Sequence, residues 1–195
     1  NEQPGLTHPQ QEVKASLQEP INTPALAQLV SRSQPEDIVI VVNDVSRPTP
    51  YDKLLPPLLQ TLHRAGIKQE QITFIVATGI HRPNTVQENK ETLGAEVVAN
   101  YQVVSHNPDQ DLVNLGQLES GNQLYVNQRA VEADFVITTG VIAPHYFAGF
   151  SGGRKSIVPG IAGRETIEFN HSRMVNLLGD LPPIDDNPIS QEMIA

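Results

Sequence analysis

Three continuous runs of β-branched and apolar residues constrain the fold of this chain more than any other feature. They cover residues 37–43, 71–77 and 134–139. A strand with one exposed face alternates apolar and polar residues, whereas a continuous apolar run is typical of a strand buried on both faces of a parallel sheet. Helical patterns lie between the runs. The sequence therefore predicts an α/β fold, an open, mostly parallel sheet with helices on both faces and right-handed crossovers.

Weaker patterns predict the elements around these strands. Residues 51–65 have a helical pattern that Gly66 ends, and Pro56 and Pro57 must lie near its first turn or break it. Residues 84–87 can cap a helix that ends at Gly94. Short strands are expected at 101–105, 112–115 and 123–127, the last two joined in a hairpin around 120–122, and residues 164–171 have a helical pattern.

We expect one main domain with a flanking segment on each side. Residues 1–30 are rich in Gln, Pro and Asn without periodicity, and they are predicted to be an irregular lead-in with one short helix near 23–30. Residues 31–180 are expected to form the α/β domain. Residues 181–195 are expected to be a linker or the beginning of the next element. A chain of 195 residues is long enough for one substantial core.

Composition excludes several classes of function. The formal net charge is −9 and the Lys and Arg residues are scattered, which argues against a nucleic-acid partner. No apolar run is long enough to cross a membrane. The chain has no cysteine, so it can form neither disulfides nor thiolate zinc sites. We expect a cytoplasmic protein whose metal, if it has one, is held by imidazole, carboxylate or a ligand that a cofactor brings.

Polar residues follow each of the three buried runs directly. They lie at 43–48, which include Asp44 and Arg47, at 78–83, which include His81, and at 140–145, which end in His145. In an open parallel sheet the ligand crevice lies beyond the carboxyl ends of the strands, so these segments are expected to converge on one edge. Each segment alone would be a weak signal, but the three together favour a functional site.

A glycine-rich loop with two cations follows at residues 147–156. It contains Gly152, Gly153, Arg154 and Lys155, and glycines allow the backbone to approach an anion closely. The loop is not a P-loop, because Arg154 stands where that pattern requires glycine, and a nucleoside triphosphatase is disfavoured. A flexible turn with solvated cations is the simpler alternative. His171, farther along the chain, would by itself be interpreted as structural.

These residues resemble the N-terminal domain of the nickel-pincer lactate racemases. The matching segments contain Asp44 and Arg47, Thr78 to Pro83, and the block from His145 to Ala162, followed by Asn170 to Ser172. The resemblance implies the Rossmann-like N-terminal domain of a two-domain enzyme. It also implies a nickel-pincer nucleotide, a pyridinium thioamide/thiocarboxylate mononucleotide, joined covalently to Lys155 beside Gly152 and Gly153. His171 would be the protein's ligand to nickel.

The resemblance further implies a racemase of a small 2-hydroxy acid, with lactate as the leading substrate. His81 and His145 would be the catalytic acid and base in a proton-coupled hydride transfer. Arg47 would bind the substrate carboxylate, and Asp44 would orient a neighbour in the same loop. The expected partners are cofactor-maturation enzymes and the C-terminal domain of the same enzyme, without which the fragment is expected to be inactive.

Two other functions remain open at this stage. One is an epimerase that applies the same chemistry to a longer hydroxy acid or a sugar acid. The other is a non-catalytic module that binds an anion or a nucleotide through the glycine-rich loop.

Overall fold

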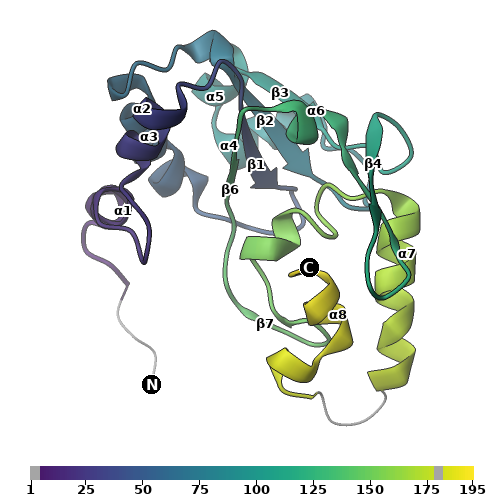
Figure 1. Cartoon of the computed structure of the whole chain (residues 1–195). Coiled ribbons are helices and arrows are strands. Elements are labelled where there is room, and N and C mark those ends of the chain that lie inside the picture. The colour runs from purple at the N-terminus through teal and green to yellow at the C-terminus, as the bar shows by residue number, and fades with distance from the viewer. Residues whose placement is uncertain (1–4, 178–181) are drawn as a thin grey trace.

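The computed structural model describes residues 5–177 and 182–195. Its centre is a sheet of four parallel strands in the order β3-β2-β1-β6, shown in Figure 1. The strands are β1 (Ile38–Asn43), β2 (Ile72–Ala77), β3 (Gln102–Ser105) and β6 (Phe135–Thr138). The three apolar runs of the sequence are thus strands, and the predicted α/β fold with an open parallel sheet is confirmed.

Both faces of the central strands are buried, which explains why their sequences are apolar throughout. Along β1, Ile38, Ile40 and Val42 belong to the larger core cluster, while Val39 and Val41 belong to a second cluster on the opposite face. All five side chains are fully buried. A strand with only one covered face would have had polar residues at alternate positions.

Five helices lie on the side of the first face of the sheet, where α1 packs against α3 rather than against the strands. They are α1 (Pro9–Gln18), α2 (Leu26–Ser33), α3 (Tyr51–Arg64), α4 (Val86–Leu93) and α5 (Ala95–Asn100). The short helix near 23–30 and the capped helix that ends at Gly94 are confirmed in position by α2 and α4. The rest of the lead-in is not irregular, because α1 lies in it. This helix buries no residue completely, which is why its apolar pattern was too weak to predict it.

Helix α3 continues through Pro56 and Pro57, which lie in its second turn, so the prediction that they would stand near the first turn or break the helix was wrong. A proline in a helix removes the N–H that would bond the carbonyl four residues earlier. For Pro56 that carbonyl belongs to Asp52, and it accepts a hydrogen bond of 3.1 Å from Gln10 Nε2 of α1 instead. The contact between α1 and α3 therefore satisfies a carbonyl that the proline leaves free.

The second face is covered by shorter elements. Helix α6 (Gln128–Glu132) and the predicted hairpin of β4 (Leu112–Gln117) and β5 (Gln123–Asn127) lie over it, together with Ile157 and Ile161. Helices thus lie on both faces, although on this side the described residues form one short helix. The strand order places β1 at a reversal, because the chain continues from β1 to β2 and β3 on one side and later returns to β6 on the other. Ligand crevices in open α/β sheets lie at such reversals.

The chain then forms a second layer beyond the carboxyl ends of the strands. It contains β7 (Pro144–His145), β8 (Gly149–Phe150), α7 (Arg164–Ser172) and α8 (Pro188–Glu192), with 3-10 turns at Gly153–Ser156, Arg173–Leu177 and Ile184–Asp186. A further 3-10 turn, Gln69–Gln71, directly precedes β2 at the other end of the sheet. Figure 1 shows α8 beside α7 below the sheet. Ile189 and Met193 of the tail are buried against Phe147 and Ile167 in a third core cluster. The division of the chain into domains stays a prediction, but the tail packs against this layer.

Candidate functional site

A pocket of about 490 Å³ lies where the strand ends meet the second layer. Seven of the eight site residues predicted from the sequence line it: Asp44, Arg47, His81, His145, Gly152, Lys155 and His171. The eighth, Gly153, does not line it. The convergence that the strand-end rule predicts is therefore present, and the glycine-rich loop and α7 supply the remaining wall.

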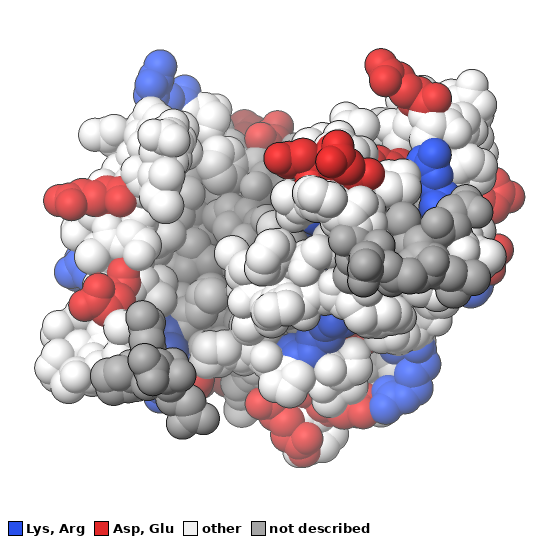
Figure 2. All heavy atoms as spheres, turned by 90° about the horizontal axis from the view of Figure 1, so that it is seen from below, with Lys and Arg blue, Asp and Glu red and all other residues white. Residues whose placement is uncertain are grey.

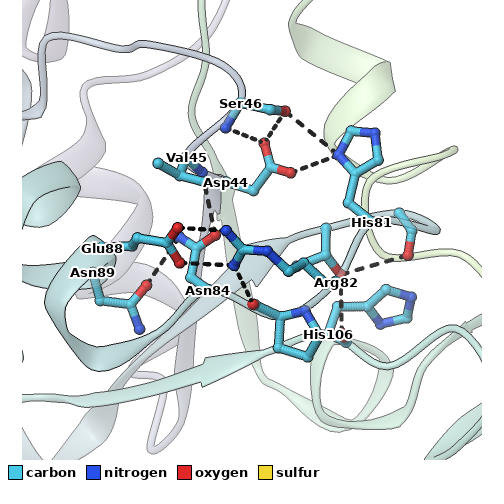
Figure 3. A network of polar contacts seen from close by, with 12 residues as sticks. Asp44, Val45, Ser46, His81, Arg82, Asn84, Glu88, Asn89 and His106 are labelled. Atoms are coloured by element: carbon cyan, nitrogen blue, oxygen red, sulfur yellow. Dashed lines mark hydrogen bonds and ion pairs between the residues drawn. The ribbon is translucent and has the colours of Figure 1, made fainter.

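Asp44 and His81 form a pair at the ends of β1 and β2, which Figure 3 shows. The Nδ1 of His81 lies 2.7 Å from Asp44 Oδ2. Ser46 donates to the other oxygen of Asp44 through its Oγ at 2.6 Å and its backbone N–H at 3.2 Å. The side chain of Asp44 is only 4% exposed, whereas that of His81 is 53% exposed. The buried carboxylate therefore fixes the imidazole orientation and leaves the other ring nitrogen free for a ligand.

Arg82, which follows His81, does not share this role. Its guanidinium makes two hydrogen bonds, of 2.8 and 2.5 Å, to the carboxylate of Glu88, and it bonds the carbonyl of Pro83 (Figure 3). Glu88 in turn accepts from the N–H of Thr85 and completes the cap of α4. The pKa of Glu88 falls to about 2 because of this arginine and this N–H. Arg82 therefore stabilises the loop that carries His81.

His145 lies on β7, between two aromatic rings. It stacks on Tyr146 with ring centroids 5.0 Å apart and meets the edge of Phe147 at 4.6 Å. Burial lowers its pKa to about 4, and the positive charges of Lys155 and Arg47 add to this effect. The imidazole is therefore neutral at pH 7 and can accept a proton.

Lys155 lies in the 3-10 turn after the glycines. Its Nζ is 5.2 Å from the centroid of the Phe147 ring, and none of the carboxylates in the described residues forms an ion pair with it. Burial lowers its pKa to about 8, with further contributions from Arg47 and Arg154. A minor fraction of this amine, far larger than for an ordinary lysine, is therefore neutral and nucleophilic near physiological pH.

Gly152 is required by the backbone that precedes Lys155. Its φ is +74°, a conformation that other residues rarely adopt, and an added Cβ would lie 3.1 Å from both the Val141 carbonyl oxygen and Ile142 Cγ1. Gly152 also accepts a hydrogen bond from the N–H of Lys155. The glycine is therefore part of the turn that presents the lysine, rather than only a flexible hinge.

His171 lies in the last turn of α7 and faces the pocket. Its ring meets the edge of Phe147 with centroids 5.0 Å apart, and its Nδ1 is buried without a hydrogen-bond partner among the described residues. Burial lowers its pKa, the backbone carbonyl of Ile167 opposes this shift, and the charge of Lys155 adds to it. A neutral imidazole in a pocket is suited to bind a metal.

Phe147 is the residue that sequence reasoning missed. Its ring is 4% exposed and contacts His145, His171 and the ammonium group of Lys155. The only signal in the sequence was an aromatic residue two positions after His145 at the start of the glycine-rich loop. The other two histidines with defined contacts, His63 and His106, bond to backbone and side-chain groups away from the pocket.

The charge of the pocket differs from that of the whole chain. Arg47 and Lys155 line it, and Asp44, paired with His81, is the only carboxylate among the lining residues. Elsewhere Lys and Arg lie scattered among acidic and uncharged residues, and Figure 2 shows no continuous basic surface on the face it presents. The helices in the described part of the chain are all too short or too polar to cross a membrane. The site is thus a locally cationic pocket lined by three histidines, an arrangement suited to bind a small organic anion.

Comparison with known proteins identifies the family. Residues 1–178 match the model of the lactate racemase N-terminal domain, and this chain belongs to that family. It is 40% identical over 186 residues to a lactate racemase from Thermoanaerobacterium thermosaccharolyticum and 42% identical over 165 residues to one from Lactiplantibacillus plantarum. These alignments cover 93% and 84% of the chain, but only 43% and 38% of the two relatives. The chain therefore spans about two fifths of their length.

Solved structures agree with the fold. The lactate racemase apoprotein from T. thermosaccharolyticum superposes with a TM-score of 0.88 at 38% identity, over 95% of this chain and 45% of that one. A protein from Thermotoga maritima superposes with a TM-score of 0.75 at 22% identity, over 94% of this chain and 46% of that one. The second match concerns the fold alone, whereas the first supports the family assignment.

Proposed function

We propose that this chain is the cofactor-carrying half of a racemase that interconverts the stereoisomers of a small 2-hydroxy acid, with lactate as the leading substrate. One observation carries the proposal: two histidine bases, a lysine with a lowered pKa and a third histidine line the same cationic pocket. The named lactate racemases among its relatives support the choice of reaction.

The residues fit a nickel-pincer nucleotide. A covalent thioamide requires a neutral amine that can be acylated, and Lys155 has a pKa lowered to about 8 and no carboxylate partner in the described part of the chain. A nickel ion needs more donors than His171 alone, and the described residues contain no cluster of three or more His, Asp or Glu side chains that could hold a metal. Sulfur donors from the cofactor would complete such a site without cysteine.

His81 and His145 are suited to move the hydroxyl proton. Racemisation breaks the C–H bond at Cα while the hydroxyl loses its proton, which gives a planar 2-keto acid that can be reduced on either face. The cofactor, when bound, supplies the acceptor and donor of the hydride. One histidine takes the hydroxyl proton of one enantiomer, and the other returns a proton to form the opposite enantiomer. They come from different walls of the pocket, as two bases for opposite enantiomers should.

Arg47 and Asp44 support this chemistry in different ways. A planar guanidinium binds a carboxylate with two parallel hydrogen bonds, and Arg47 lines the pocket beside both histidines. Asp44 keeps Nδ1 of His81 occupied, so that only Nε2 can exchange a proton with substrate. Together they would orient the substrate and define which nitrogen acts as the base.

A further domain and accessory enzymes would complete this chemistry. The relatives extend well beyond the matched region, and a C-terminal domain would cover the pocket and exclude water. Cofactor-maturation enzymes would load Lys155. We expect the protein to act in the cytoplasm, where the absence of cysteine carries no cost.

The decisive experiment uses the full-length protein produced together with the maturation enzymes. We expect an added mass on Lys155, bound nickel, and conversion of D-lactate to L-lactate. His81→Ala and His145→Ala should each lower the rate by roughly 10²–10⁴-fold, the usual contribution of an acid or base, while nickel is retained. His171→Ala should lose the metal, and Lys155→Ala should lose both the added mass and the metal.

His63→Ala is the matched control, because this histidine bonds Ile67 and Tyr101 outside the pocket and should leave racemisation unchanged. A panel of longer hydroxy acids and sugar acids separates a lactate enzyme from an epimerase with the same chemistry. An unmodified Lys155 without nickel in the matured protein would instead favour the non-catalytic anion-binding module and refute the proposal.

A further inference from the structure

Helix α7 carries two neighbouring stripes with different contacts. Ile167 and His171, four residues apart, both line the pocket. Thr166 and Asn170, also four residues apart, are fully buried on the adjacent stripe. Residues spaced by four lie one above the other on a helix, so each pair marks one face. The position of the buried polar stripe therefore fixes where His171 points.

Thr166 joins the polar stripe to the hairpin. Its Oγ1 donates to the carbonyl of Gln123 at 2.6 Å and accepts from the N–H of Tyr125 at 2.9 Å. Its own carbonyl accepts from Asn122 Nδ2 at 3.0 Å. These three bonds hold the first turn of α7 against β5 and the hairpin turn that precedes it.

Asn170 joins the same stripe to α8, four residues nearer the site. Its Nδ2 donates to Glu192 Oε2 at 2.6 Å and to the carbonyl of Ile189 at 3.3 Å. Glu192 is itself 5% exposed, and its other oxygen accepts from Ser120 Oγ at the hairpin tip. Arg173 lies 3.9 Å from that oxygen. A buried carboxyl group thus connects α8, α7 and the hairpin at one point beside His171.

We propose that Glu192, through Asn170, is a positioning residue that sets the direction of the His171 imidazole. Neither residue lines the pocket. The inference rests on the proposed function only in taking His171 as the ligand of a metal. Whether Glu192 controls the orientation of α7 at His171 can be tested without metal.

A small rotation of α7 would be sufficient to disturb the site. Side-chain ends lie about 5–6 Å from a helix axis, so a rotation of 20° moves an imidazole nitrogen by about 2 Å. Metal sites require ligand distances within about 0.2 Å of their ordinary values. Helix α7 continues directly into the 3-10 turn Arg173–Leu177, and Asn170 is the buried residue that anchors its last turn.

The first test uses the imidazole resonances of the unloaded full-length protein labelled with ¹³C histidine. Glu192→Ala should shift the ring signal of His171, assigned by its absence in His171→Gln, and leave that of His81 in place. Glu192→Gln is the matched control, because an amide oxygen can still accept from Asn170 while its N–H₂ group meets Ser120. We expect this variant to keep the wild-type His171 signal.

The second test measures nickel retention by the matured protein during dialysis against a chelator. Removing a partner that orients a metal-bound histidine typically costs about 10–100-fold in affinity. Glu192 acts through one intervening residue, so we expect Glu192→Ala to weaken nickel retention by about tenfold, the low end of that range. Glu192→Gln should retain nickel as the wild type does, with unchanged KM for the hydroxy acid.

Glu192→Asp covers the case in which the alanine variant fails to fold. It keeps the carboxyl group but is one methylene shorter, so it cannot reach Asn170 and Ser120 together, and it should shift the His171 signal. An unchanged His171 signal in Glu192→Asp, or equal effects of the Gln and Asp substitutions, would overturn the inference. If the matured wild type binds no nickel, the proposed function fails, while the resonance test of Glu192 still stands.

Discussion

Gly160 offers the sharpest test of how the loop around Lys155 is built. The N–H of Gly160 donates to the carbonyl of Lys155 at 3.0 Å, and its own carbonyl accepts from the N–H of Gly79 at 2.9 Å. A Cβ added at Gly160 would lie 2.3 Å from the carbonyl oxygen of Ser156 and 2.9 Å from that of Lys155. Both neighbours are backbone atoms, which cannot rotate away as a side chain could.

The magnitude follows from these distances. The closest contact is about 1.1 Å short of the 3.4 Å at which ordinary contact begins, so the turn must open by roughly that amount. Overpacking of this kind typically costs about 1–3 kcal/mol. The loss of chain entropy in the unfolded state, about 0.4–1 kcal/mol for Gly→Ala, offsets only part of it. We expect Gly160→Ala to lower the free energy of unfolding by about 2 kcal/mol, which is about 4–8 °C in Tm for a chain of this size.

Thermal unfolding of the purified chain, followed by circular dichroism, measures this shift. Gly140→Ala is the matched control, because a Cβ there would meet only the Asn43 side chain and Gly152 Cα, at 3.6 to 3.7 Å, which is ordinary contact. We expect its Tm to be unchanged or slightly raised. If the two variants unfolded at the same temperature, the turn would not be closely packed at Gly160 and the reasoning would be refuted.

Two further predictions concern Lys155 in the pocket and the buried Tyr51 behind it. Because the pKa of Lys155 is lowered to about 8, its rate of acylation by a small reagent should rise through pH 8 and then level off. The acylation rate of an ordinary lysine rises until about pH 10.4. Peptide mass spectrometry measures both rates, and a Lys155 profile centred near pH ~10.4 would contradict the burial of the amine. Tyr51→Phe removes a buried hydroxyl that accepts from the N–H of Asn43 at 2.6 Å and pairs with Thr139 Oγ1 at 3.1 Å. The backbone N–H of Asn43 that this leaves unpaired should lower the free energy of unfolding, measured by calorimetry, by about 1–3 kcal/mol. Tyr101→Phe is the control and should lower it less, because the Tyr101 hydroxyl bonds a histidine at an exposed position.

The sequence was informative wherever burial on two faces determined the residue type. The β1 strand is apolar throughout because helices cover one face and α6 with the hairpin covers the other. Once the parallel sheet was predicted, the strand-end rule was sufficient to bring Asp44 and His81 together, since β1 and β2 are paired neighbours in register. The contact of 2.7 Å between them is a consequence of that register.

Features that depend on partners far along the chain could not be predicted in this way. Helix α1 is held by polar contacts such as that of Gln10 with Asp52. Its sequence therefore lacks the apolar periodicity from which a buried helix is predicted. Phe147 gains its role from three neighbours that approach it from β7, the glycine-rich loop and α7. Glu192 would be interpreted from sequence as a solvated residue in a polar tail, although the structure buries it.

The two walls of the pocket are held by different means, and this difference determines which substitutions should matter. The wall with Asp44 and His81 continues directly from paired strands of the sheet. The wall with Lys155 and His171 lies outside the sheet and is tied to it by separate hydrogen bonds, among them Ser156 Oγ to the carbonyl of Thr139 and Gly79 N–H to the carbonyl of Gly160, and by the packing of Ile157 and Ile161. Losing one such bond changes the spacing between the walls more readily than it unfolds the core, because each contributes only about 1 kcal/mol. The relative position of the proposed bases and the proposed cofactor residues therefore depends on these tethers together with the packing of Ile157 and Ile161 on the sheet.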